Sequence, residues 1–143
     1  MTLTKDEVLA EISWYNEQLV YLKDTFVSWM EEEGRKVDVS EEKIMNTEGL
    51  SGQYSTIKYT LIFDKNMKLC LIPYGIWIVA ARGRVDISGP SGSEKLIYLY
   101  KGGPVTQFDD INEEGWHWFD DSTIRKMEKL SKEIFGYLIG RLQ

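Results

Sequence analysis

The chain contains one cysteine and one histidine among its 143 residues. The single thiol, Cys70, cannot form an intrachain disulfide or contribute to a zinc site built from several cysteines. The lone histidine, His117, has no second histidine at the short spacing of a metalloprotease motif. We therefore expect no disulfide, and the sequence indicates no metal and no cofactor.

Long hydrophobic runs are also missing. The longest uncharged stretch, residues 69–81, is interrupted by Pro73 and Gly75, and it is far shorter than the roughly 20 residues of a membrane-spanning helix. The first residues lack the basic and then apolar arrangement of a signal peptide. We therefore expect a cytoplasmic protein that does not associate with membranes.

Basic residues are outnumbered. The chain has 17 Lys and Arg against 23 Asp and Glu, a net charge of -6 and a pI near 4.9. Proteins that bind nucleic acid usually present a basic face to the phosphates, so we do not expect a nucleic-acid partner. An acidic surface favours solubility and basic protein partners.

Recognisable catalytic motifs are absent. The chain has no Gly-x-Ser-x-Gly nucleophile elbow, and its glycines do not have the spacing of a nucleotide-binding loop. The glycine-rich segment 88–94 joins two expected strands, as a hairpin turn does. Adjacent carboxylates fall in expected loops and caps. No residue is assigned a catalytic role, and an enzyme is not the favoured interpretation.

The N-terminal segment has the clearest pattern. Thr4 and Glu7 have the spacing of a capping box, and apolar residues then recur at alternating steps of four and three as far as Trp29. This predicts a long helix that ends near Gly34. The helix either lies across other elements of its own chain or pairs with a second copy in a homodimer. The recurring residues are Val8, Ile12, Tyr15, Leu19, Leu22, Phe26 and Trp29.

Strand-like segments follow this helix. After a short helical turn capped by Ser40 and reaching Asn46, we expect strands over 55–63, 67–72, 76–87 and 95–100, with a further short strand over 116–119. A last helix is expected to start at Asp121 or Ser122. The predicted fold is a single α+β domain, 1–143. It has a long N-terminal helix, an antiparallel meander of four to five strands and a C-terminal helix, with both helices on one face of the sheet.

Two glycines lie in the expected last helix. Gly136 and Gly140 are four residues apart and share a face, although each costs roughly 1 kcal/mol relative to alanine. We expect another backbone, that of the first helix, to approach closely there.

The expected strand 76–87 turns from apolar to charged. Arg82, Arg84 and Asp86 occupy alternate positions and should share one face. One interpretation is a surface ladder in which an arginine pairs with Asp86. The other is an anion site, because two guanidinium groups offer planar sets of donors.

The segment around His117 is the second candidate. If it is extended, Trp116 and Trp118 share one face and His117 lies on the other. A packed or surface histidine, a metal ligand and a catalytic base are all open interpretations. The indoles either fill the core or form an aromatic patch for a partner.

These observations favour a small, non-enzymatic protein-interaction module. Its specific form would be an acidic inhibitor or immunity-type partner of a basic protein. The alternative is a binding domain or enzyme for an anionic small molecule, held by Arg82 and Arg84. The candidate binding residues are Arg82, Arg84, Asp86, Trp116, His117 and Trp118.

Overall fold

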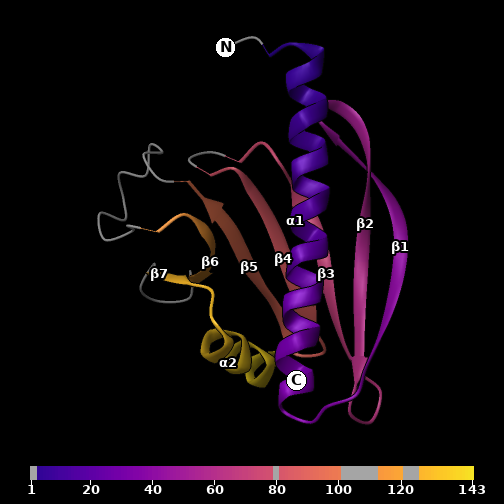
Figure 1. Ribbon diagram of the computed structural model, residues 1–143, viewed down its shortest axis with the longest axis vertical. Helices are drawn as coiled ribbons and strands as arrows, with labels where there is room; N and C mark the ends of the chain where they lie inside the picture. Colours follow the sequence, from indigo (N-terminus) through magenta and orange to yellow (C-terminus); the bar gives the residue numbers. More distant parts are fainter. Residues whose placement is uncertain (1–2, 79–80, 101–112, 121–125) are drawn as a thin grey trace.

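The part of the chain that the structure describes folds into a helix, seven β-strands and a second helix (Figure 1). The structure is a computed structural model, and it describes residues 3–78, 81–100, 113–120 and 126–143. The elements are α1 (Lys5–Glu32), β1 (Val37–Glu48), β2 (Gly52–Phe63), β3 (Met67–Gly75), β4 (Gly83–Gly89), β5 (Gly92–Leu99), β6 (Gly115–Asp120), β7 (Lys126–Lys129) and α2 (Lys132–Leu142).

Helix α1 begins as its sequence predicts. The Thr4 hydroxyl accepts a hydrogen bond from the Glu7 backbone, and the Glu7 carboxylate accepts one from the Thr4 backbone, both at 3.1 Å. This closes the capping box and satisfies two N–H groups that a helix start leaves free. The apolar stripe packs on the sheet. Its buried members are Tyr15, Leu19, Leu22, Phe26 and Met30.

The seven strands form one antiparallel sheet whose spatial order follows the sequence, β1 to β7. The α+β class is confirmed. The strand count is not, because seven strands are present instead of four to five. The two additional strands are β1 and β7, which lie at the two ends of this order.

Strand β1 replaces the short helical turn expected from Ser40 to Asn46. Every residue from Val37 to Glu48 pairs with β2 in an unbroken register that runs from Phe63 to Gly52. Strand β2 pairs with β3 only from Tyr59 onwards, so residues 52–58 of β2 pair with β1 alone. Charged residues are weak strand formers, and the pairing with β2 therefore determines the conformation of β1.

The single strand expected over 76–87 is interrupted. Strand β3 continues through Pro73 to Gly75, the register shifts there, and β4 begins only at Gly83. The Glu48 carboxylate accepts hydrogen bonds at 3.1 Å from the backbone N–H groups of Ile76 and Trp77. Because these two N–H groups donate to Glu48, they are not available for hydrogen bonds that would continue β3 beyond Gly75.

Helix α2 begins later than expected. The Ser131 hydroxyl accepts a hydrogen bond from the Ile134 backbone at 3.2 Å and caps a helix that starts at Lys132. Residues 126–129, expected to be helical, form β7 and pair with β6. The predicted start at Asp121 or Ser122 lies outside the described residues.

The core lies between the helices and one face of the sheet, which we call the helix face; the opposite face is the outer face. The rings of Phe26 in α1 and Phe135 in α2 stack with their centroids 4.1 Å apart. In Figure 1, α1 runs across the sheet and α2 packs beside its C-terminal end. Both helices therefore cover the helix face, as the sequence predicts.

Candidate functional site

Arg84 and Asp86 form a bidentate pair on the outer face. The Arg84 Nε and Nη2 atoms donate to the two Asp86 carboxylate oxygens at 2.8 and 3.1 Å. The guanidinium group also lies 3.6 Å from the ring centroid of Tyr74. The alternate residues of β4, including Val85, are buried on the helix face. This is the surface ladder that the sequence predicts.

Arg82 has a different environment. It precedes β4, and its guanidinium group donates to both carboxylate oxygens of Glu11 in α1, at 3.2 and 2.8 Å. It also stacks over Trp14, 3.8 Å from the ring centroid. The hydrogen bond to Glu11 raises the pKa of Arg82. The expectation that Arg82 shares a face with Arg84 and Asp86 is wrong, because the continuous strand on which it rested is broken before Gly83.

These contacts bear on the anion hypothesis. An anion that bound the Nε and Nη2 donors of Arg84 or of Arg82 would displace Asp86 or Glu11, respectively. Two-pronged pairs between arginine and carboxylate are among the stronger charged contacts in proteins. Nothing in this geometry favours an anion site at these two arginines.

Trp116 and Trp118 belong to the core, with 2 % and 4 % of their surfaces exposed. The Trp116 indole nitrogen donates to Gln18 of α1 at 2.9 Å, and the Trp118 nitrogen donates to Glu94 at 3.0 Å. Both side chains lie on the helix face, as the alternation predicts. Since both indoles are buried and hydrogen-bonded, they do not form an exposed aromatic patch.

His117 lies between them in β6 and is 3 % exposed. Its Nδ1 is 2.9 Å from the carbonyl oxygen of Gly115. Because a carbonyl can only accept, Nδ1 carries the hydrogen. Burial lowers the pKa of His117, and the nearby Lys129 lowers this pKa further. Among the described residues, no group of three His, Cys, Asp or Glu side chains is placed to hold a metal ion.

The histidine should give a measurable pH dependence of stability. Below about pH 6.5 the unfolded chain binds a proton at His117, whereas the folded chain, with its lowered pKa, resists it. The free energy of unfolding should therefore fall as the pH falls from 6.5 towards 5, with a slope of at most about 1.4 kcal/mol per pH unit. Urea unfolding of the wild type and His117→Gln across this range measures it. Equal slopes in the two proteins would contradict the prediction.

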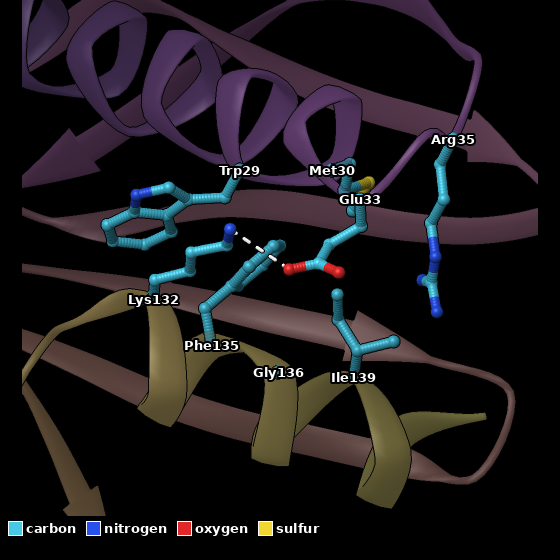
Figure 2. A pocket seen from close by; sticks show the side chains of 8 residues that line it. All are labelled: Trp29, Met30, Glu33, Arg35, Lys132, Phe135, Gly136 and Ile139. Atoms are coloured by element: carbon cyan, nitrogen blue, oxygen red, sulfur yellow. Dashed lines mark ion pairs between the residues drawn. The ribbon is translucent and has the colours of Figure 1, made fainter.

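A cavity of about 320 Å³ lies between the end of α1 and α2. Figure 2 shows Lys132 and Glu33 pointing toward each other across it, and their charged atoms are 2.9 Å apart. The Lys132 ammonium group also lies 2.9 Å from Glu32. The cavity thus has apolar walls and a charged rim. At this rim Lys132 is already paired with Glu32 and Glu33. Its lining residues are Trp29, Met30, Glu33, Arg35, Lys132, Phe135, Gly136 and Ile139.

The glycines of α2 are not explained by close packing. A Cβ atom added to Gly136 or to Gly140 would meet no described atom within 4 Å apart from its chain neighbours and the nearby backbone of α2 itself. The expectation that the backbone of α1 approaches them is therefore wrong. At Gly136 there is open space beside the cavity instead.

Gly136→Ala should therefore stabilise the protein by about 0.5–1 kcal/mol, because alanine restricts the unfolded chain and fits the space. Thermal unfolding measures the change. Gly89→Ala is the control and should destabilise, because its Cβ would lie 2.5 Å from the carbonyl oxygen of Leu142. A loss of stability in Gly136→Ala would show that this space is needed by the fold.

A second cavity, of about 360 Å³, lies between α1 and the β1–β2 ribbon. Its walls are mostly apolar, and Lys43 of β1 is one of the residues that line it. Lys23 of α1 lies over the ring of Tyr59, 5.4 Å from the centroid. The lining residues are Asn16, Leu19, Val20, Lys43, Ser55, Thr56, Ile57 and Tyr59.

The acidic charge is concentrated in the two elements that border this cavity. Residues 1–48, which contain α1 and β1, carry 12 acidic and five basic side chains. Residues 49–143 carry 11 acidic and 12 basic side chains, so the first third of the chain carries more negative charge than the net -6 of the whole chain. On α1, exposed acids recur every seven residues at Glu17, Asp24 and Glu31. The sequence patterns considered above concern apolar spacing and rare residues, and they do not reveal this asymmetry.

Comparison of the chain with protein-family models, with curated proteins and with solved structures finds no match. In the described part of the chain, neither helix is long and apolar enough to cross a membrane. The geometry and charge of the residues themselves therefore carry the functional argument.

Proposed function

We propose that this protein is an interaction module that binds a basic partner protein through the acidic region formed by α1 and β1. The observation that carries the proposal is the placement of the net charge. Residues 1–48 hold an excess of seven acidic side chains, and α1 lies beside the β1–β2 ribbon (Figure 1). A region of one sign accelerates encounter with a partner of the opposite sign and selects against like-charged proteins.

Two further observations support binding over catalysis. Both arginines of the former anion hypothesis are engaged by Glu11 and Asp86, and His117 is buried against Gly115. None of these three side chains lines either of the two cavities described above. Inhibition of a basic enzyme is the specific form of the function that this charge pattern favours.

Selection from a displayed library of random peptides of about 12 residues tests the proposal. We expect the selected peptides to be rich in Lys and Arg, with affinities that fall as salt rises from about 50 to about 300 mM. Glu17→Lys/Asp24→Lys should weaken their binding about tenfold, since reversing two exposed charges costs roughly 1–2 kcal/mol. Glu113→Lys/Glu133→Lys makes the same change in net charge outside the acidic region and should bind normally. Selection of no peptide, or of peptides without a basic bias, would contradict the proposal.

A further inference from the structure

We propose that β1 binds an extended segment of the partner as an additional β-strand, and that this segment alternates apolar and basic side chains. The inference rests on the proposed function and specifies how the partner docks. Three observations carry it: the free edge of β1, the charges along β1, and the apolar surface on the helix face of this strand.

Strand β1 lies at the end of the sheet, and no described strand pairs with its other edge. All of its 12 residues pair with β2 without a bulge, and none is proline. In an antiparallel strand every second residue directs its N–H and C=O groups away from its neighbour. Strand β1 therefore presents an unbroken row of backbone groups that no described strand pairs with, about 40 Å long.

Natural edge strands are usually short, bulged, proline-bearing or covered, because an open edge pairs with other chains. Strand β7, at the other edge of the sheet, has this kind of protection because it is only four residues long. In the described part of the chain, the charged side chains of β1 are the one such feature that protects its edge. A long, regular and exposed edge is the template that peptides use when they add a strand to a sheet.

The charges of β1 specify the partner. The strand carries four acidic side chains and a single lysine, Lys43. Asp38 and Glu42 lie on the outer face, because Val39 between them pairs with Leu61, which is buried on the helix face. Like charges directly opposite each other destabilise a strand pair, and opposite charges stabilise it. Basic side chains on the outer face of an added strand would therefore be stabilised by Asp38 and Glu42.

The helix face of β1 carries no net charge between Val37 and Met45, because Glu41 and Lys43 on this face have opposite signs. Val39 is 42 % exposed there, and the 360 Å³ cavity that Lys43 lines opens toward α1 beside Val20. Since side chains alternate along a strand, the residues of the partner that face this side would be apolar. The expected partner segment thus has basic residues at every second position and apolar residues between them.

Amide hydrogen exchange of the wild-type protein tests this docking mode. The probe is a synthetic peptide with the most enriched sequence from the displayed library. The control peptide has the same composition in an order without alternation. We expect the amides of every second residue of β1 to exchange rapidly in the free protein, because they face solvent. Saturation with the peptide should slow them at least about tenfold, and the control peptide should have a much smaller effect.

Each outcome has a distinct meaning. Binding of basic peptides without slower exchange in β1 would overturn the strand addition and leave the proposed function standing. Failure to select any basic peptide would overturn the proposed function and this inference with it. If these amides exchanged slowly without peptide, and more slowly at higher protein concentration, a second copy of the chain would occupy the edge. That result would overturn the docking of a partner segment there. Asp38→Lys/Glu42→Lys should lose peptide binding about tenfold, measured against Glu113→Lys/Glu133→Lys.

Discussion

Phe26→Ala should destabilise the protein by about 3–5 kcal/mol. The Phe26 side chain is fully buried, and it stacks on Phe135 at an angle of 4° between the ring planes. It also lies 5.9 Å from the ring of Trp29. Removing the ring takes away its own burial and leaves a cavity at the junction of both helices with the sheet. The midpoint of thermal unfolding should fall by roughly 10 °C or more.

Tyr21→Ala is the matched control for this substitution. Tyr21 is an aromatic residue on the same helix, but 57 % of its side chain is exposed. Its removal should change the free energy of unfolding by no more than about 0.5 kcal/mol. Denaturant unfolding of both variants decides the comparison. Similar losses in the two variants would show that the stacked pair is not at the centre of the core.

Glu48→Ala should cost about 2–3 kcal/mol, an unusually large effect for a carboxylate in a hairpin. The Glu48 side chain accepts hydrogen bonds from the backbone of Ile76 and Trp77 and from the Tyr54 hydroxyl. Burial and the contact with Glu48 raise the pKa of Tyr54 well above its ordinary value. Without the carboxylate, these donors lose a charged acceptor at a partly buried site.

Glu42→Ala is the matched control, because Glu42 lies on the same strand, is exposed and pairs opposite Lys58. It should leave stability within about 0.5 kcal/mol of the wild type. Chemical denaturation measures the free energy, and amide exchange at Ile76 and Trp77 reports the local effect. If exchange at these amides stayed slow in Glu48→Ala, the carboxylate would not be what holds the end of β3.

The parts of the fold that the sequence predicts are those that local patterns determine. Thr4 and Glu7 are three residues apart, and the apolar stripe of α1 from Val8 to Trp29 repeats over about six turns of helix, so both signals lie within one element. The hairpin of β2 and β3 is equally local, with its turn at Asp64–Asn66. Asp64 and Asn66 take positive φ angles there, as Asp and Asn do more readily than other side chains.

The errors arise where distant residues determine the local structure. Strand β1 is held by pairing with β2 and has few apolar residues of its own. The break after Gly75 depends on Glu48, which lies 28 residues before Ile76. The late start of α2 depends on whether Ser131 or an earlier residue forms the cap, and the apolar spacing alone does not distinguish them.

The candidate site shows the same division. The pair of Arg84 and Asp86 follows from strand alternation and was predictable. The pairing of Arg82 with Glu11 joins residues 71 positions apart, and no sequence spacing indicates it. The open edge of β1 could not be inferred while its residues were assigned to a helical turn.

The position of α1 in the chain has a consequence for synthesis. Its apolar stripe is synthesised before the strands that cover it, and Gln18 meets Trp116 only after 98 further residues have been added. Phe135, which stacks on Phe26, follows later still. At about 5–20 residues per second, at least several seconds pass before β6 and α2 complete the surface on which α1 packs. During this interval the nascent chain exposes apolar residues of α1. We therefore expect chaperones to bind mainly to the N-terminal third of the chain.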